Sequence, residues 1–422
     1  MSLLSTSPQP ADNFPKISQL VDSVRSDQIA PPVKSFTNSL LPTERVSLVH
    51  DYLLVMRGAE RTFAAIADLY ADAPIYTLLH DEMATSGRFA SRSITTSWLQ
   101  RLGASQATFR RLLPLYPNAI ERLELADADV VVSSSSAFAH GVRVPEEAIH
   151  ICYCYTPFRY AWDEQCFAFS ELSPLLRPLL RRLLYRIRRW DRAASSRVDA
   201  YIAISGLSQE RIRRCYGREA PIIHPPVETD RFAPGQPGES LLVVSELVRH
   251  KRLHVALEAA RRAHAPIRVV GSGPDHADLA EAYPEAEFLG RVEDKDLAEI
   301  YAGARAVVMP SVEEFGIVAV EAQAAGRPVI AAAAGGALET VADGQTGRLV
   351  ALDDVESFAR AIREIDDLDF DPANAMRNAE RFSVASFQRR LAEYVTLTLQ
   401  RRNELTGRPP GQARQDRQAL AA

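Results

Sequence analysis

The chain has 422 residues, of which 46% are hydrophobic and 24% are charged, and its formal net charge is −5 at pH 7. These values are typical of a globular protein with two domains, and the negative charge argues against a nucleic-acid partner. No apolar run approaches the length of a membrane span, and the polar first residues do not resemble a secretory signal. We therefore expect a cytoplasmic protein that does not bind nucleic acid.

The first half of the chain predicts one α/β domain preceded by a loose extension. Residues 1–44 are rich in Ser, Pro, Asp and Gln and show little periodicity, so we expect no regular structure there. Strands and helices alternate over residues 45–226, which predicts a parallel sheet covered by helices. The expected strands are 46–49, 75–79, 130–132, 149–155 and 199–204, and the expected helices are 59–70, one near 105–113, and 175–190.

The second half predicts another domain of the same class. Two Pro-rich segments, 224–227 and 234–238, mark the boundary between the domains. Strands and helices alternate again over residues 227–383, so we expect a second doubly wound, Rossmann-like domain. Residues 384–400 predict a last amphipathic helix, and residues 401–422 predict a disordered tail.

The helix expected at 175–190 carries leucines along one stripe and arginines over the rest of its surface. One interpretation is core packing of the leucine stripe with a solvated arginine face. The other is contact with an anionic membrane surface, to which basic amphipathic helices bind. Both interpretations stay open.

The densest group of ligand-binding features lies between a strand expected at 304–309 and a helix expected at 315–325. Gly316 leaves the first N–H groups of the helix accessible to a phosphate, which the helix dipole also favours. Glu321 lies too far along the helix to sit on that phosphate, but it could accept hydrogen bonds from ribose hydroxyls. Glu313 could meet another polyol on the opposite side. Taken singly, each feature is common, but together they describe a nucleotide-sugar site.

The same stretch carries a resemblance to a known family. E-x7-E followed by A-x-A-x-G-x-P-V-I-A resembles the signature of retaining glycosyltransferases of family 4, which have the two-domain GT-B fold. The matching residues are Glu313, Phe315, Gly316, Glu321, Gly326 and Pro328. The resemblance covers residues 45–395 and is strongest over 241–350. It implies two Rossmann-like domains that face a cleft, with the donor held mainly by the second domain and the acceptor by the first.

In the second domain, the resemblance implies that Glu313 and Lys251 are catalytic. Lys251 matches the lysine of the family pattern G-R-L-x-x-x-K, whose arginine and lysine neutralise the donor diphosphate. Glu246 stands at the arginine position, where a carboxylate cannot bind phosphate, so Arg249 or Arg252 is expected to substitute. The other donor-binding residues that we expect here are Phe315, Gly316, Ile317, Glu321, Gly271, Arg291 and Val292.

In the first domain, residues 153–163 resemble the C-H-T-P-x-R-Y-x-W-D stretch of bacterial O-antigen and exopolysaccharide mannosyltransferases of the same family. Tyr155 falls on the histidine that contacts the donor sugar in the family. We therefore expect Tyr155 to be the third catalytic residue, with its hydroxyl directed at the donor sugar. Tyrosine does not carry charge near neutral pH as imidazole does, so either the contact is altered or activity is reduced.

Two further donor-binding residues are expected in the first domain, Gly58 and Ser205. Gly58 belongs to the stretch Arg57 to Arg61, which resembles the Gly-Gly loop of the family with Arg57 in place of the first glycine. Arg57 either narrows access to the backbone or meets a phosphate, and a turn with solvated charges is the alternative. Ser205 ends the last strand expected in this domain.

The resemblance implies a retaining glycosyltransferase that needs neither a metal nor a cofactor. It would move a sugar from a nucleotide diphosphate sugar to a glycan or a lipid-linked oligosaccharide, as in lipopolysaccharide or exopolysaccharide biosynthesis. The stretch 153–163 favours GDP-mannose as the donor, and a UDP- or dTDP-sugar is the alternative. The alternative functions are a synthase that joins a nucleotide sugar to a sugar phosphate and a weakly active scaffold that binds a nucleotide sugar. Peripheral contact with the cytoplasmic membrane face follows if the acceptor is lipid-linked.

Overall fold

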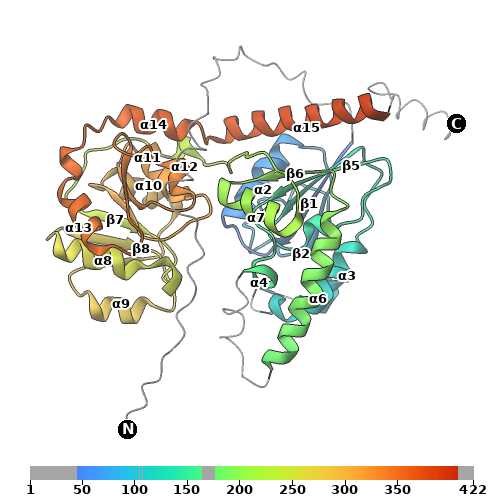
Figure 1. Cartoon of the computed structure of the whole chain (residues 1–422), viewed down its shortest axis with the longest axis horizontal. Helices are drawn as coiled ribbons and strands as arrows, with labels where there is room; N and C mark the ends of the chain where they lie inside the picture. The colour runs from blue at the N-terminus through green and yellow to red at the C-terminus, as the bar shows by residue number, and fades with distance from the viewer. Residues whose placement is uncertain (1–44, 104, 107, 164–175, 407–422) are drawn as a thin grey trace, which may run out of the picture. The chain divides into compact units, whose positions relative to one another are not determined.

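The computed structural model describes residues 45–103, 105, 106, 108–163 and 176–406. The extension expected at 1–44 and the tail beyond residue 406 lie outside the described residues. Within the described part, the chain forms two six-stranded sheets, one before and one after the Pro-rich segments. The predicted α/β fold with two doubly wound domains is confirmed (Figure 1).

The first sheet has the order β3-β2-β1-β4-β5-β6, and all neighbouring strands are parallel. Its strands are β1 (Val46–Leu53), β2 (Ile75–His80), β3 (Ile94–Thr96), β4 (Val130–Ser135), β5 (Ile149–Cys154) and β6 (Ala200–Ala203). The direction of strand addition reverses between β1 and β4, where Val46 lies opposite Val130.

The second sheet repeats this order as β9-β8-β7-β10-β11-β12, again with parallel strands throughout. Its strands are β7 (Leu241–Val244), β8 (Ile267–Val270), β9 (Glu287–Gly290), β10 (Val307–Met309), β11 (Val329–Ala332) and β12 (Gly347–Val350). The switch point lies between β7 and β10, where Leu242 is opposite Val307. Open sheets of this kind bind ligands at the carboxyl ends of the strands beside the switch point.

Both faces of each sheet are covered by helices. In the first sheet, α2 (Gly58–Leu69) and α15 (Val384–Thr406) pack on one face, and α3 (Tyr116–Glu121) and α6 (Arg177–Ser195) pack on the other. In the second sheet, α11 (Ile317–Ala324) packs on one face, and α8 (Leu253–Arg262) and α13 (Val355–Arg363) pack on the other. The remaining helices are α4 (Arg159–Trp162), α7 (Gly206–Tyr216), α9 (His276–Ala282), α10 (Asp294–Ala302), α12 (Ala337–Thr340) and α14 (Pro372–Glu380).

Three expected helices differ from the structure by five residues or more. The helix expected at 175–190 is observed as α6, which continues to Ser195. The segment near 105–113 forms a 3-10 turn at Phe109–Leu115, because Pro114 has no N–H group to continue a helix. The last helix, expected to end at residue 400, continues to Thr406. Residues 401–406 contain helix formers such as arginine, glutamate and leucine and no glycine or proline, so part of the expected disordered tail is helical.

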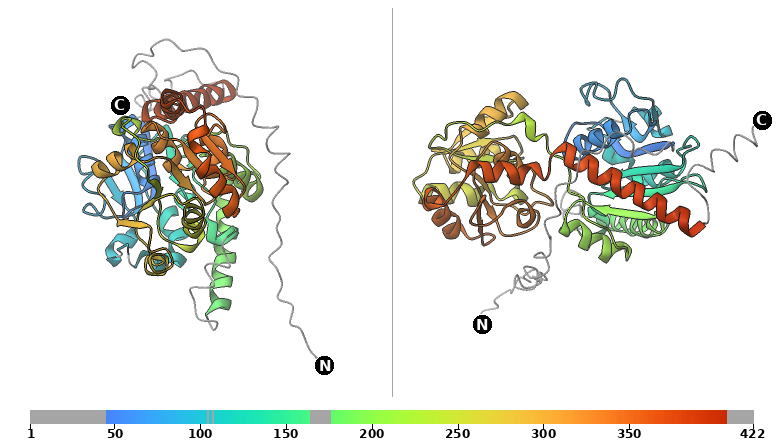
Figure 2. Two further views of the ribbon diagram at one scale, coloured as in Figure 1. Left: turned by 90° about the vertical axis from the view of Figure 1, so that its left-hand side faces the viewer. Right: turned by 90° about the horizontal axis from the view of Figure 1, so that it is seen from above.

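The chain passes between the two domains twice, through the Pro-rich segments and again after α14. The two passages meet, because the Val227 N–H group donates to the Phe382 carbonyl at 2.8 Å and Val227 forms a parallel bridge with Ser383. Helix α15 then lies along the first domain (Figures 1 and 2), where Gln388 Nε2 donates to the Ala65 carbonyl at 2.9 Å. The second domain is thus followed by a helix that belongs to the core of the first.

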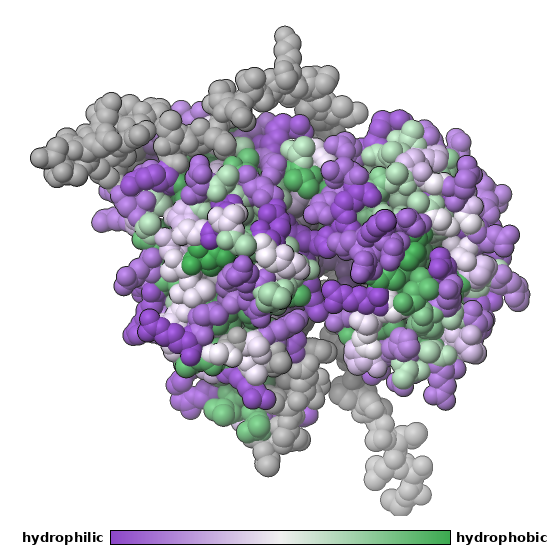
Figure 3. All heavy atoms as spheres, turned by 180° about the vertical axis from the view of Figure 1, so that it is seen from behind, coloured by the Kyte–Doolittle hydropathy of each residue, from purple (hydrophilic) through white to green (hydrophobic). Residues whose placement is uncertain are grey.

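None of the helices in the described part of the chain is long and apolar enough to cross a membrane. The face shown in Figure 3 is largely hydrophilic, and its hydrophobic side chains appear in separate patches.

We expect Gly271→Ala to destabilise the second domain strongly. Gly271 has a φ of +138°, and an added Cβ would lie 1.8 Å from the Ser245 carbonyl oxygen. Backbone strain and this clash should together lower the free energy of unfolding by about 3 kcal/mol or more. Gly217 is the matched control, since its φ is +67° and nothing lies within 4 Å of an added Cβ. Gly217→Ala should lower the free energy of unfolding by only about 1–2 kcal/mol. Equal losses of unfolding free energy for the two variants, measured in urea, would contradict the prediction.

Candidate active site

The turns after β7 and β10 bring together two of the three residues predicted to be catalytic. Lys251 ends the 3-10 turn Arg249–Lys251 that follows β7, and Glu313 lies in the loop after β10. Lys251 Nζ is 2.7 Å from both carboxylate oxygens of Glu313, and Ser311 Oγ donates to Glu313 Oε1 at 2.6 Å. The two charged side chains are 23% and 25% exposed, so solvent screens their attraction less than it screens a surface pair.

The loop that carries Glu313 ends at the start of α11. Gly316 precedes this helix with a φ of +88°, a conformation that glycine adopts without strain. The first N–H groups of α11 have no partner within the helix, which suits an anion. The Phe315 ring is buried, and its centroid lies 5.4 Å from the His224 ring and 5.4 Å from the Phe382 ring. Its side chain therefore anchors the loop, and the expected contact of Phe315 with a donor stays a prediction.

Glu321 lies within α11 and is fixed on one side only. Its Oε2 accepts a hydrogen bond from the buried Tyr301 hydroxyl at 2.7 Å, and its Oε1 accepts none from the described residues. Burial raises the pKa of Glu321, and the Tyr301 hydrogen bond and the charges of Arg231 and Arg61 oppose this shift. A carboxylate with one oxygen fixed and one available has the acceptor capacity that a ribose hydroxyl needs.

A charged cluster beside Glu321 was not predicted from the sequence. Arg61 of α2 lies 2.6 Å from Asp294, at the start of α10, and 3.5 Å from Glu228. Arg231 lies 3.0 Å from Glu228 and 3.3 Å from the same Asp294. Arg61 belongs to the stretch compared with the family loop, but only the tertiary fold brings it to a partner 233 positions away.

The turns after β8 and β9 hold three more predicted donor-binding residues. The Gly271 N–H group donates to the Gly290 carbonyl at 2.8 Å, so it is not available to a ligand. Gly271 instead allows the ends of β7 and β8 to approach closely. Arg291 is exposed and Val292 is half-buried just beyond β9. Their contact with a nucleobase stays a prediction.

The arginines near Lys251 differ in their partners. Arg252 Nε lies 3.0 Å from Asp353 Oδ1, which holds its guanidinium at the turn before α13. Arg249 is exposed and forms no ion pair with another described residue. Arg57 of the first domain lies 4.0 Å from Glu246. The two departures from the family pattern therefore face each other, and Arg57 offsets the negative charge of Glu246.

The structure corrects the role expected for Tyr155. Its ring is buried in the core, and its hydroxyl donates to the Ala59 carbonyl at 2.8 Å and lies 3.0 Å from Ser134 Oγ. The hydroxyl therefore ties the end of β5 to the first turn of α2 and is not directed at a donor sugar. The physical reason is the strand register, because the Tyr155 N–H group donates to the Ser135 carbonyl at 2.9 Å and turns the side chain toward α2.

Gly58 and Ser205 have structural roles at helix starts. A Cβ on Gly58 would lie 3.2 Å from Ile317 Cδ1, so Gly58 allows the start of α2 to approach the start of α11. Ile317 makes this contact from the first turn of α11. Ser205 is buried, and its Oγ accepts a hydrogen bond from the Ser208 N–H group at 3.2 Å to cap α7. The hydroxyl of Ser205 is thus a helix cap, and its contact with a donor stays a prediction.

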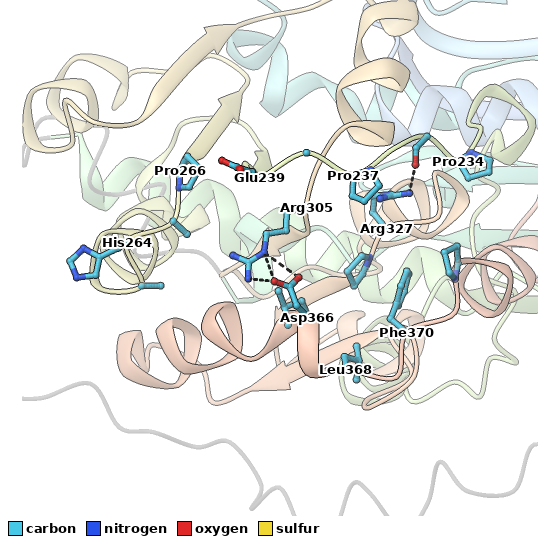
Figure 4. Close-up of a pocket in the computed structure, with 17 residues that line it drawn as sticks. Pro234, Pro237, Glu239, His264, Pro266, Arg305, Arg327, Asp366, Leu368 and Phe370 are labelled. Carbon is cyan, nitrogen blue, oxygen red and sulfur yellow. Dashed lines mark hydrogen bonds and ion pairs between the residues drawn. The ribbon is translucent and has the colours of Figure 1, made fainter.

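A separate hollow of about 790 Å³ lies in the second domain (Figure 4). Its lining includes Glu239, Pro266, Arg305 and Pro328, which stand within two residues of the starts of β7, β8, β10 and β11. It therefore lies at the amino ends of these strands. Lys251 and Glu313 lie at the carboxyl ends, so this hollow is not the candidate active site.

The site as a whole combines a positive group and a helix start with carboxylates suited to hydroxyl groups. Lys251 and the first turn of α11 can stabilise a diphosphate. Glu313 and Glu321 can accept hydrogen bonds from hydroxyls on either side of it. Among the residues that the structure describes, no group of three His, Cys, Asp or Glu side chains is placed to hold a metal ion.

The chain is similar to several known proteins. Residues 238–367 match the model of the family described as glycosyl transferases group 1. The D-inositol 3-phosphate glycosyltransferase of Streptomyces avermitilis is 32% identical over 249 residues, which cover 48% of this chain and 52% of that protein. That of Mycolicibacterium smegmatis is 32% identical over 210 residues, which cover 41% and 48%. The chain spans about half the length of the curated relatives that it matches.

Solved structures resemble a larger part of the chain. HepE of Anabaena in complex with UDP-glucose has a TM-score of 0.61 at 20% identity and covers 84% of this chain and 99% of its own. Sucrose-phosphate synthase from Thermosynechococcus elongatus has a TM-score of 0.62 at 18% identity and covers 83% and 98%. At these identities the likeness establishes the fold alone.

The two parallel sheets and the likeness to these structures show that the chain has the GT-B fold. The match over residues 238–367 is more specific, because it makes the second domain similar to the family described as glycosyl transferases group 1.

We expect Tyr155→Phe to lower stability without affecting nucleotide binding. Loss of the hydroxyl removes its hydrogen bonds to the Ala59 carbonyl and Ser134 Oγ, which should lower the free energy of unfolding in urea by about 1–2 kcal/mol. Tyr185 is 59% exposed, so Tyr185→Phe is the matched control with no expected change. Tyr155→His should not raise sugar transfer, because the position does not face a donor. A tenfold gain in transfer for this variant would restore the catalytic role.

Proposed function

We propose that the protein is a retaining, metal-independent glycosyltransferase that moves a sugar from a nucleotide diphosphate sugar to a glycan or a lipid-linked acceptor. The observation that carries the proposal is the contact of Lys251 with Glu313 beside the switch point of the second sheet. The start of α11 and Glu321 follow in the same segment. The family match over residues 238–367 supports the reaction class.

Donor binding would begin with competition for Lys251. In the free protein, Glu313 holds the ammonium group through both of its carboxylate oxygens. An arriving diphosphate competes with Glu313 for that group and also meets the first N–H groups of α11. Glu313, once released, accepts a hydrogen bond from the donor sugar. Glu321 Oε1 accepts one from the ribose at the other end of the diphosphate.

Transfer then requires stabilisation of the charge that develops on the leaving diphosphate. Lys251 and the helix N–H groups supply it from fixed positions, so little reorganisation accompanies the reaction. The leaving phosphate takes the proton of the acceptor hydroxyl on the same face of the sugar, and the new bond keeps the anomeric configuration. No side chain acts as a nucleophile.

For the donor, two observations favour different bases. The resemblance of residues 153–163 to polysaccharide mannosyltransferases favours GDP-mannose, as in lipopolysaccharide or exopolysaccharide synthesis. The solved structures of HepE contain UDP or UDP-glucose, which favours a UDP-sugar. A calorimetric screen of GDP-, UDP- and dTDP-sugars decides between them, with glycans, lipid-linked oligosaccharides and inositol 3-phosphate as acceptors for any donor that binds. A donor that binds but is not transferred to any acceptor favours the scaffold alternative.

Lys251→Ala should weaken the binding of a nucleoside diphosphate about 10- to 100-fold. A charge-assisted hydrogen bond is worth about 1.5–3 kcal/mol, which corresponds to this range of affinity. Lys295 in α10 is the matched control, because it is an exposed lysine of the same domain. Calorimetry should show unchanged affinity for Lys295→Ala. Equal affinities for the two variants would remove Lys251 from the site.

Glu321→Ala should weaken nucleotide binding only when the ribose hydroxyls are present. Loss of one hydrogen bond to a charged acceptor should lower the affinity for a nucleoside diphosphate about tenfold or more. The affinity for the 2′,3′-dideoxynucleoside diphosphate should be the same for the variant and the parent protein. If the variant weakens binding of both ligands equally, Glu321 does not contact the ribose.

We also propose that α6 contacts an anionic membrane surface from the cytoplasmic side. Leu179 on this helix is 69% exposed and Tyr185 is 59% exposed, so its leucine stripe is not wholly buried. The only acidic residue of the helix, Asp191, is fully buried. The exposed arginines of the helix are Arg177, Arg181, Arg182, Arg186, Arg188, Arg189 and Arg192.

Replacement of four of these arginines by glutamine should abolish binding to phosphatidylglycerol vesicles. Each arginine near an anionic surface contributes about 1 kcal/mol, so the four together account for a loss of roughly 1000-fold in partitioning. The positions are Arg181, Arg182, Arg186 and Arg189. The control replaces four arginines of α8 and α13, namely Arg261, Arg262, Arg360 and Arg363. Equal sedimentation of both variants with the vesicles would rule out α6 as the contact.

A further inference from the structure

Two neighbouring glutamates in the loop after β10 face different domains. Glu313 is held by Lys251 of its own domain, whereas Glu314 is held by side chains of the first domain. Arg211 of α7 places Nη1 2.5 Å from Glu314 Oε1, and Arg159 places Nη1 3.8 Å from the same oxygen. The donor-side loop is therefore tied to the first domain one residue away from the site.

Arg211 is itself fixed by the segment that resembles the mannosyltransferase stretch. Its Nη1 donates to Thr156 Oγ1 at 3.3 Å, and its Nε lies 3.6 Å from Asp163 Oδ2. Arg214, one turn further along α7, lies 2.6 Å from both oxygens of Asp163. Arg211 and Glu314 are only 19% and 25% exposed, so solvent screens this pair weakly.

A second carboxylate of the second domain contacts the first residue of α7. Glu339 lies in α12, which follows β11, and its Oε1 accepts a hydrogen bond from the Gly206 N–H group at 2.9 Å. Its Oε2 lies 2.8 Å from His224 Nε2 in the first passage between the domains. Glu339 thus receives the first N–H group of α7, where a negative charge is favoured.

We infer that α7 is a two-point clamp between the domains and that Arg211 is a positioning residue for sugar transfer. The two carboxylates, Glu314 and Glu339, follow the successive strands β10 and β11 of the second sheet. They contact one helix of the first domain at Arg211 and at Gly206. This inference rests on the proposed function and deepens it, because it assigns how the acceptor side is held against the donor loop.

Loss of the clamp should affect kcat and nucleotide affinity differently, whereas loss of a donor-site residue should change both. Lys251, Glu313 and Glu321, which are proposed to contact the donor, all lie in the second domain. Nucleotide binding therefore does not require the clamp, whereas transfer requires the acceptor-side domain to be held in register with the donor. Loss of the clamp should lower kcat and leave the affinity for a nucleoside diphosphate unchanged.

The test compares Arg211→Ala with Arg213→Ala. Arg213 lies on the same helix but pairs with Glu210 of that helix, three residues earlier, and both side chains are more than half exposed. We expect Arg211→Ala to lower kcat at least tenfold with the nucleoside diphosphate Kd within twofold of the parent. Arg213→Ala should stay within twofold in both measurements. Arg211→Lys, which keeps the charge, should retain more activity than Arg211→Ala.

A double-mutant cycle and a structural measurement complete the test. Glu314→Gln should lower kcat in the parent protein and have no further effect in Arg211→Ala, because the two residues act through one contact. Small-angle scattering of the ligand-free protein should show a larger radius of gyration for the combined variant Arg211→Ala, Glu339→Ala than for Arg213→Ala. The scattering measurement does not depend on turnover. Thermal unfolding shows that each variant is folded.

Parental kcat for Arg211→Ala would overturn the inference. A Kd that weakens in proportion to kcat would also overturn it, because Arg211 would then belong to the donor site. If the parent transfers no sugar from any donor, the proposed function fails, and scattering alone tests the clamp. In that case an unchanged radius of gyration for the combined variant overturns the clamp as well.

Discussion

The ion pair between Lys251 and Glu313 is the contact on which the candidate site depends. It joins the connection after β7 to the connection after β10, on either side of the switch point in the second sheet. These two connections diverge from each other and so leave room for a ligand. In the free protein, Glu313 supplies the hydrogen-bond and charge partner of Lys251, whose side chain is only partly exposed to solvent. It also means that the groups proposed to bind the diphosphate and the sugar are linked before any donor arrives. The affinity for the donor then depends on how much more strongly the Lys251 ammonium group interacts with the diphosphate than with Glu313.

Much of the fold could be predicted from the sequence, because the strands are short apolar runs and the helices between them carry regular apolar faces. The expected strand at 75–79 is observed as β2, which is one residue longer, and the expected helix at 59–70 is observed as α2 shifted by one residue. The segment near 105–113 could not be predicted in the same way, because one proline changes its hydrogen bonding. The individual residues Lys251 and Glu313 were also predicted, but their direct contact was not.

Residue roles that depend on side-chain direction were harder to predict. Tyr155 aligns with a family histidine, yet the register of β5 turns it toward α2 and the Ala59 carbonyl. Phe315 matches the family signature, yet it packs between His224 and Phe382. Arg57 and Glu246 are two differences from the family pattern that are unrelated in the sequence, yet they lie opposite each other in the structure. In each case the deciding partner lies far away in the sequence, where local pattern carries no information.

The meeting of the two interdomain passages at Val227 and Ser383 has a mechanical consequence. Two connections at separate places would each limit domain motion at its own position, whereas connections that are hydrogen-bonded at one place join the domains there at a single point. Helix α15 continues from this point along the first domain and is hydrogen-bonded to it. Rotation about this point is therefore the relative motion of the domains that leaves the hydrogen bond between the two connections intact. Such a rotation changes distances most at the points farthest from the axis and least beside it.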